Sequence, residues 1–249
     1  MENYINYRGI LVPFSNLKQG GIDNAIKYGI YPLEEDITLN KLFRPRDVVY
    51  DIGSYIGSHS ILFALQGAEV FAFEPSPFNY HRCLENCKNF RQIHVLDYAL
   101  HEKEYEVETL FKDCNNQDGI DKMQKIKYKI LSNIIKEKNL PLPNFIKMDI
   151  EGMETLVLKT MDDIFLNCRP ILFIELHKKS IEDKTQDYEN NPHWRDVSQG
   201  GFDFNTLKKY NYKFIWRDGK ENFIDKNEEL NWNDEIGPSV ILIPKEKIK

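Results

Sequence analysis

Short apolar runs that suit β-strands alternate with stretches that suit helices from residue 47 of the sequence onward. This alternation is typical of a parallel sheet with helices on both faces. The expected strands are 47–51, 70–73, 93–96, 145–150 and 171–176, and the expected helices are 58–65, 78–88, 131–138 and 154–165. The pattern therefore predicts a doubly wound α/β fold.

The other segments depart from this alternation of strands and helices. Residues 104–111 alternate charged with apolar or aromatic side chains, which predicts a half-exposed strand. Residues 112–125 are rich in polar side chains and are interpreted as a loop. A short helix is expected over 204–210, and strands are expected over 212–216 and 239–243. Because no helix is expected between these last two strands, we predict that they are antiparallel neighbours.

The length of 249 residues suits one α/β domain with embellishments. We expect this domain to span residues 46–249, and residues 1–45, which carry several tyrosines, to form an N-terminal cover segment or an oligomer surface. Residues 178–200 are polar and are interpreted as a surface insertion, and such insertions often line a substrate site. The oligomeric state is left open by these patterns.

Charge and hydropathy narrow the possible partners. A formal net charge of -6 provides no basic field to neutralise a phosphate backbone, so nucleic acid is not expected as a substrate. No apolar run approaches the roughly 20 residues that cross a bilayer, and the first residues do not match a signal peptide. We therefore expect no membrane insertion and a cytoplasmic location. Cys83 and Cys87 lie without the second pair that a zinc site requires, so reduced thiols are expected.

A glycine-containing turn is expected where the first strand meets the first helix, in Asp51-Ile52-Gly53-Ser54-Tyr55-Ile56-Gly57. Two glycines four positions apart let the backbone approach a ligand closely. Their spacing differs from the G-x-G-x-x-G of dinucleotide-binding proteins, and Asp51 immediately precedes the turn. A carboxylate at this place suits a ligand with a cationic ammonium and repels a pyrophosphate.

Acidic residues also follow the next two strands. Glu74 follows the second strand, where an acid accepts hydrogen bonds from ribose hydroxyls. Asp97 follows the third strand, within reach of an adenine amino group. Taken singly, each acid would more often be a solvated strand end or a helix cap. Three acids at successive strand ends instead favour a site for a nucleoside.

Four motifs lie at the expected strand ends: Asp51-x-Gly53-x-x-x-Gly57, Phe73-Glu74-Pro75, Lys147-Met148-Asp149-Ile150-Glu151-Gly152-Met153-Glu154, and Glu175-Leu176-His177. Together they resemble the motifs of the FkbM-type methyltransferases, and the resemblance covers roughly residues 47–177. It implies a Rossmann-like, mostly parallel seven-stranded sheet with a C-terminal antiparallel strand. It also implies S-adenosylmethionine as the cofactor and O-methylation of sugars, glycolipids or macrolide-type natural products.

The resemblance further implies which residues hold the cofactor. The expected site comprises Asp51, Gly53, Gly57, Glu74 and Asp97, with their neighbours Ser54, Tyr55, Pro75, Tyr98 and Ala99, and with Asp149. The family usually has Leu-Asp-Asp before the fourth strand, whereas this chain has Leu131-Ser132-Asn133 there. This departure leaves open a cofactor-binding module without catalysis. An acid after the second strand also leaves open an NAD(P)-dependent oxidoreductase.

Charged residues in and after the fourth strand mark a second group. Lys147, Asp149 and Glu151 belong to a segment expected to be buried, where lone charges are costly. One interpretation is structural: Lys147 pairs with Glu175 of the next strand, while Glu151 and Glu154 begin a helix. The other interpretation is catalytic, because ligands of open α/β sheets bind at the carboxyl ends of the strands.

In the catalytic interpretation, Lys147, Asp149, Glu151 and His177 face a small-molecule or glycan acceptor. His177 is the first choice for the base that removes a hydroxyl proton, since its ordinary pKa lies near neutrality, and Asp149 is the second choice. The set Asp149, Glu151, Glu175 and His177 could instead hold Mg²⁺ or Mn²⁺, although no metal is expected. The patterns do not identify the acceptor.

Overall fold

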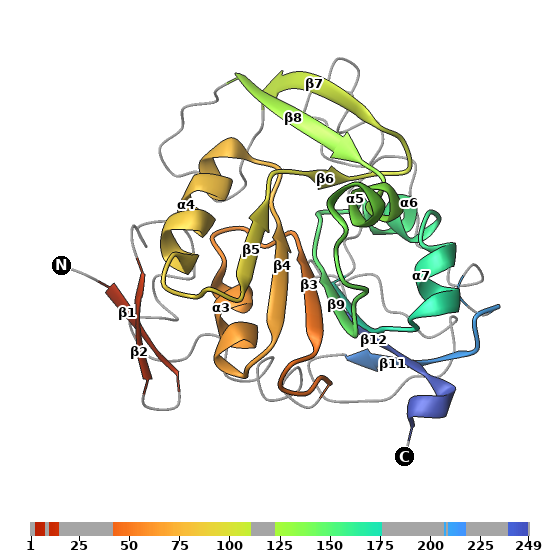
Figure 1. Ribbon diagram of the computed structural model, residues 1–249. Helices are drawn as coiled ribbons and strands as arrows, with labels where there is room; N and C mark the ends of the chain where they lie inside the picture. The colour runs from red at the N-terminus through yellow and green to blue at the C-terminus, as the bar shows by residue number, and fades with distance from the viewer. Residues whose placement is uncertain are drawn as a thin grey trace.

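The computed structural model describes residues 3–7, 10–14, 42–110, 123–175, 207, 209–217 and 239–248. Its centre is a seven-stranded sheet with the order β11-β12-β10-β9-β3-β4-β5 (Figure 1). These strands are β3 (Val48–Ile52), β4 (Glu69–Phe73), β5 (Ile93–Leu96), β9 (Phe145–Met148), β10 (Ile171–Glu175), β11 (Tyr212–Arg217) and β12 (Ser239–Pro244). Neighbours from β5 to β10 are parallel, whereas β12 is antiparallel to both β10 and β11. The predicted sheet, including its C-terminal antiparallel strand, is confirmed.

Helices cover both faces of this sheet (Figure 1), so the doubly wound prediction is confirmed. One face carries α3 (Ser58–Leu65) and α4 (Pro77–Cys87), and the other carries α5 (Leu131–Lys138), α6 (Glu154–Leu158) and α7 (Asp162–Asn167). On the first face, Phe63 packs against Phe145 of β9. On the second, Tyr50 and Phe165 belong to one buried cluster. Alternate residues of each buried strand therefore supply the two cores.

A smaller sheet lies over the carboxyl ends of β4 and β5 (Figure 1). It consists of β6 (Ala99–Leu100), β7 (Tyr105–Leu110) and β8 (Met123–Lys129), in the order β6-β8-β7. The half-exposed strand predicted over 104–111 corresponds to β7, but the loop predicted over 112–125 is wrong at its end, because β8 begins at Met123. Ile126 and Tyr128 of β8 are buried, while the lysines that alternate with them, at 125, 127 and 129, point outward, and that alternation stabilises a strand.

The helix predicted over 154–165 is also wrong in one respect, because the structure has two helices there. α6 ends at Leu158 and α7 begins at Asp162. Between them, the hydroxyl of Thr160 donates a hydrogen bond to the carbonyl oxygen of Val157 at 2.8 Å, and Met161 is fully buried. Such a side-chain bond competes with the regular helix ladder and favours a break.

Several expectations fall outside the described residues. The insertion at 178–200 and residues 176 and 177 lie there, and the helix expected over 204–210 is described only at 207, 209 and 210. Of the N-terminal segment 1–45, the structure describes an antiparallel hairpin of β1 (Asn3–Tyr7) and β2 (Ile10–Phe14), and residues 42–45. A 3₁₀ turn, η2 (Lys245–Lys247), follows β12. Within these described ranges, no helix has both the length and the apolar character of a membrane span.

Candidate functional site

The turn after β3 is fixed by neighbouring backbone. The N–H groups of Gly53 and Ser54 both donate to the carbonyl oxygen of Phe73 in β4, each at 3.0 Å. Gly53 has a φ of +80°, and a Cβ atom there would lie 1.7 Å from the carbonyl oxygen of Asp149. Only glycine permits this approach between the turn and the segment after β9. The predicted glycine turn and the Asp149 segment are therefore one structural unit.

The second glycine of the turn, Gly57, precedes α3 and packs on two thiols of α4. A Cβ atom at Gly57 would lie 2.8 Å from Cys87 Sγ and 2.9 Å from Cys83 Sγ. Cys83 Sγ is also 3.8 Å from the hydroxyl of Ser54. The hydrogen bond with Cys87 and burial raise the pKa of the Cys83 thiol well above its ordinary value. Both cysteines are free, as predicted, and they act here as packing groups beneath the turn.

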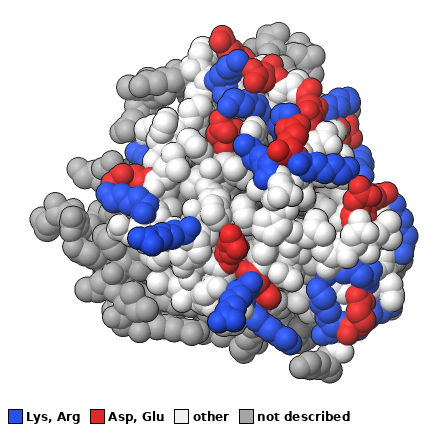
Figure 2. Space-filling model, viewed as in Figure 1, with Lys and Arg blue, Asp and Glu red and all other residues white. Residues whose placement is uncertain are grey.

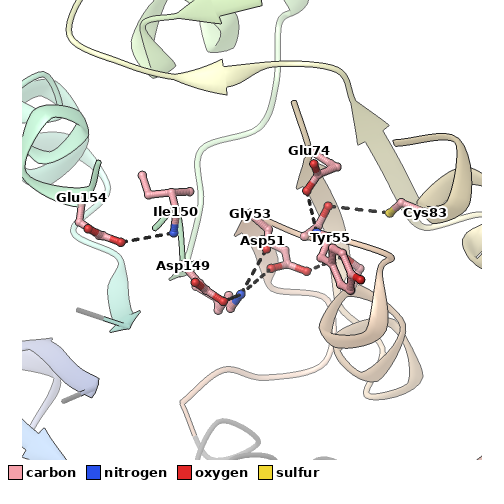
Figure 3. A network of polar contacts seen from close by, with 11 residues as sticks. Asp51, Gly53, Tyr55, Glu74, Cys83, Asp149, Ile150 and Glu154 are labelled. Carbon is pink, nitrogen blue, oxygen red and sulfur yellow. Dashed lines mark hydrogen bonds and ion pairs between the residues drawn. The ribbon is translucent and has the colours of Figure 1, made fainter. Parts of the chain in front are cut away.

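Glu74 connects the turn after β3 with the turn after β4. Its carboxylate is buried and accepts hydrogen bonds from the N–H groups of Tyr55 and Ser76, each at 2.9 Å. Pro75 lies between Glu74 and Ser76, which caps α4. Figure 3 shows the carboxylate of Glu74 directed toward Tyr55. Because a carboxylate oxygen can accept more than one hydrogen bond, this arrangement fixes Glu74 while leaving it capacity for a ligand.

Asp97 follows β5 and lies beside the smaller sheet. It forms an ion pair with Lys127 of β8, and its hydrogen bond raises the pKa of the Lys127 ammonium. Tyr98 follows, with the ammonium groups of Lys127 and Lys138 at 5.9 and 5.5 Å from its ring centre. Ala99 begins β6 and is buried. Lys127 was not among the predicted site residues, although the period-two alternation of β8 indicates an outward side chain at this position.

A buried ion pair joins β3 to β9. Asp51 and Lys147 are register partners and are 0% and 2% exposed. Ser60 of α3 donates to Asp51 Oδ2 at 2.5 Å. Lys147 Nζ lies 3.9 Å from Asp51 Oδ1, and it donates to Asp149 Oδ2 at 3.2 Å and to the carbonyl oxygen of Gly53 at 3.3 Å. Asp51 thus lies beneath the turn. Figure 3 shows the side chains of Asp51 and Asp149 on opposite sides of the polar contacts next to Gly53.

The partners of Lys147 account for a charge buried so deeply. Burial alone would lower its pKa, but the carboxylates of Asp149, Asp51 and Glu175 outweigh this and raise the pKa above its ordinary value. The charge of the predicted partner Glu175 helps to raise the pKa of Lys147, and Lys147 donates hydrogen bonds to Asp149 and Gly53. Lys147 therefore holds the glycine turn and the Asp149 segment together.

The acids after β9 separate into two roles. Glu154 is buried, and its Oε1 accepts hydrogen bonds from the N–H groups of Ile150 at 3.3 Å and Gly152 at 3.2 Å. It begins α6, as the structural interpretation predicts. Glu151 is exposed and has a φ of +55°, so it sits at the tip of the turn that Glu154 closes. Asp149 is 29% exposed, which leaves it accessible from outside.

The remaining candidates lie at the end of β10. Glu175 is the last residue of that strand and is half-buried. His177 lies outside the described residues, so the structure does not place the predicted base. Among the residues that are described, no three His, Cys, Asp or Glu side chains gather as a metal ion would require. The site that the structure does assemble is the row of strand ends at β3, β4, β5 and β9.

The sequence has detectable relatives. It matches the model of the methyltransferase FkbM domain over residues 51–214, which is more than half of the chain. Among curated proteins it is similar to the hexuronic acid methyltransferase AglP of Haloferax volcanii, with 29% identity over 136 residues. That alignment covers 53% of this chain and 56% of the relative, so the chain spans about half the length of the curated protein it matches.

Solved structures of methyltransferases are similar to it as well. A methyltransferase FkbM from Methylobacillus flagellatus is 18% identical, with 89% of this chain and 53% of that chain covered and a TM-score of 0.47. A TehB-like S-adenosylmethionine-dependent methyltransferase from Corynebacterium glutamicum is 8% identical, with 89% and 93% covered and a TM-score of 0.49. The family match includes the glycine turn, Glu74, Asp97 and the Lys147–Glu154 block. The chain belongs to the FkbM methyltransferase domain family.

Proposed function

We propose that this protein transfers a methyl group from S-adenosylmethionine to an oxygen of a sugar or glycoconjugate. The observation that carries the proposal is the placement of Glu74. Its buried carboxylate is fixed by backbone N–H groups from two turns, at the carboxyl edge of a parallel sheet where ligands of such folds bind. A preorganised acid at that place suits the two hydroxyls of a ribose.

The charges around the turn fit this cofactor. Among the described residues around the glycine turn, Asp51, Glu74 and Asp149 supply three carboxylates and Lys147 supplies one ammonium. Asp51 Oδ1 is buried and accepts no hydrogen bond from the described part of the chain. A net negative environment favours a cationic ligand and disfavours a pyrophosphate. S-Adenosylmethionine supplies a methyl group on a positively charged sulfur and also carries a cationic amine and one carboxylate, so its net positive charge matches the residues present.

The acceptor is proposed from the relatives and the family. The curated relative is named a hexuronic acid methyltransferase, which supports a sugar as the acceptor class. Methyl transfer requires the acceptor oxygen to lie in line with the methyl carbon and sulfur, and such positioning can supply on the order of 7–11 kcal/mol. A hydroxyl acceptor must also lose a proton. We assign that step to His177, because the ordinary pKa of histidine lies near neutrality, and Asp149 is the second choice. A general base typically contributes about 10²–10⁴ in rate.

Turnover of methyl-labelled S-adenosylmethionine tests the proposal. The acceptor panel contains a neutral hexose glycoside, a hexuronic acid glycoside and glycolipid extracts, and labelled products are analysed for an ether or an ester linkage. We expect label in at least one carbohydrate product from the wild-type protein and none from Glu74→Ala. Tight binding of NAD without binding of S-adenosylhomocysteine would contradict the proposal. Cofactor binding without any labelled product would favour a module that has lost catalysis.

The base is tested by a second pair of variants. His177→Ala is expected to lower kcat by about 10²–10⁴ while the Kd for S-adenosylhomocysteine changes by less than about 2-fold. The matched control is His81→Ala, because His81 is an exposed histidine of α4 and should leave both values unchanged. Equal losses of kcat and cofactor affinity in His177→Ala would show a structural role instead.

A further inference from the structure

The strand β8 contacts the segments after β4 and β5, which contain Glu74 and Asp97, two acids of the proposed cofactor site. Gln124 of β8 accepts a hydrogen bond from the hydroxyl of Ser76 at 3.1 Å, next to Glu74. Lys127 of the same strand forms an ion pair with Asp97. A hydrogen bond and an ion pair therefore join the smaller sheet to the segments that follow β4 and β5. Figure 1 shows this sheet over the ends of both strands.

The register of β6 against β8 explains how Lys127 reaches Asp97. Ala99 is paired with Tyr128 in a parallel arrangement. Continued back by two residues, this register places Asp97 at the level of Ile126, next to Lys127. Lys127 Nζ donates to Asp97 Oδ2. Within the described part of the chain, Asp97 Oδ1 accepts no hydrogen bond, and the Asp97 side chain is 41% exposed. One oxygen is held and the other remains available to a ligand.

The neighbouring lysines of β8 have different partners. Lys125 pairs with Glu106 of β7 at 2.5 Å. Lys129 pairs with Glu104 at 3.1 Å and with Glu137 of α5 at 3.2 Å. Figure 2 shows the resulting mixture of positive and negative side chains over β7 and β8. Of the three outward lysines on this described strand, Lys127 is the one paired with an acid at a strand end of the main sheet.

We propose that Lys127 is a positioning residue for the cofactor: it holds the Asp97 carboxylate so that its other oxygen accepts a hydrogen bond from the 6-amino group of adenine. This inference rests on the proposed function. Lys127 acts through Asp97 and does not itself contact the ligand. An acid held by a partner loses less side-chain freedom when the ligand binds, so the hydrogen bond to adenine becomes more favourable.

The expected effect is selective for the adenine amino group. Wild-type protein should prefer S-adenosylhomocysteine over its 6-deamino analogue, in which hydrogen replaces the amino group, by about 10-fold or more, as for hydrogen bonds to a charged acceptor. In Lys127→Met, affinity for S-adenosylhomocysteine should fall by about 3- to 10-fold while affinity for the analogue stays nearly constant. The preference for S-adenosylhomocysteine should therefore fall by the same factor, about 3- to 10-fold, relative to the wild type.

Calorimetric titration of both ligands into four proteins tests this. Lys127→Arg keeps a cation that reaches Asp97, so it should retain most of the preference. Lys125→Met is the matched control, since it removes a lysine two positions away on the same strand face and should leave both affinities unchanged. Thermal unfolding of each variant establishes that the fold is intact. An unchanged preference in Lys127→Met, or tighter binding of S-adenosylhomocysteine, would overturn the inference.

The outcomes separate this inference from the function on which it rests. If wild-type protein binds neither ligand, both the proposed function and the role of Lys127 are rejected. If the wild type binds S-adenosylhomocysteine and the preference is the same in Lys127→Met, only the role of Lys127 is rejected. An equal loss of affinity for both ligands in Lys127→Met would show that Lys127 only stabilises the smaller sheet, and this also overturns the inference.

Discussion

Replacement of Lys147 by methionine should destabilise the protein strongly, because it leaves a fully buried carboxylate without its cation. Asp51 is 0% exposed and lies 3.9 Å from the ammonium of Lys147. At that distance and an effective dielectric constant of about 20, the attraction between two unit charges is about 4 kcal/mol. Removing one partner of a buried pair typically costs about 3–5 kcal/mol. Asp149 adds less, because its side chain is 29% exposed and can be hydrated.

We therefore expect the free energy of unfolding to fall by about 3–4 kcal/mol in Lys147→Met, measured by urea denaturation followed by circular dichroism. The control is Lys136→Met, whose partner Asp163 is 4.0 Å away with both side chains mostly exposed, and its loss should stay below about 1 kcal/mol. Adding Asp51→Asn to Lys147→Met should recover part of the loss, since it removes the isolated charge. A loss below about 1 kcal/mol in Lys147→Met would refute this reasoning.

Three further predictions concern the surrounding structure. Gly53→Ala should prevent folding or cost more than about 3 kcal/mol, because its Cβ would overlap the carbonyl of Asp149; soluble protein with wild-type thermal stability would contradict this. Glu154→Ala should lower the free energy of unfolding by about 1–3 kcal/mol, since two N–H groups lose their acceptor, whereas the exposed Asp163→Ala should change it little. Burial raises the pKa of the Cys168 thiol from 9.0 to about 11, so the folded protein retains this proton longer than the unfolded chain. Its contribution to stability is present below pH 9 and is lost as the pH rises toward 11, and Cys168→Ala should show a shallower decline in urea titrations over that range.

Most of the fold could be predicted from the alternation of apolar strand-like runs with helical stretches in the sequence. The helix α3 has the predicted bounds, 58–65, because Gly57, with a φ of +86°, precedes the helix and an apolar run over residues 61–65 packs into the core. The antiparallel pairing of β11 with β12 was also predicted correctly. These features depend on local periodicity and on the absence of an intervening helix, and both can be seen in the sequence.

The errors came from local patterns that two structures satisfy equally well. β8 was interpreted as loop up to residue 125, because three lysines at alternate positions mask two buried apolar side chains. The break between α6 and α7 was missed because Leu158, Met161 and Phe165 keep a helical spacing across it. The pairing with β7 decided the outcome for β8, and the side-chain hydrogen bond of Thr160 favoured the helix break.

The site was predictable at the strand ends and not between them. Asp51 lies near the end of β3, and Glu74 and Asp97 directly follow β4 and β5. The carboxyl ends of these parallel strands meet at one edge, so the proximity of the three acids follows from topology. Ser60 and Lys127 come from other elements, and no spacing in the sequence connects them to the acids they contact. His177 and Leu176 lie outside the described residues, and the role of His177 stays a prediction.

Determination of a crystal structure with S-adenosylhomocysteine tests the central claim most directly. We expect the ribose hydroxyls within about 3 Å of the Glu74 carboxylate, with the adenine directed toward Asp97 and the amino acid portion over the Gly53 turn. Density for the ligand away from the ends of β3, β4 and β5 would contradict the assignment of these acids as the cofactor site.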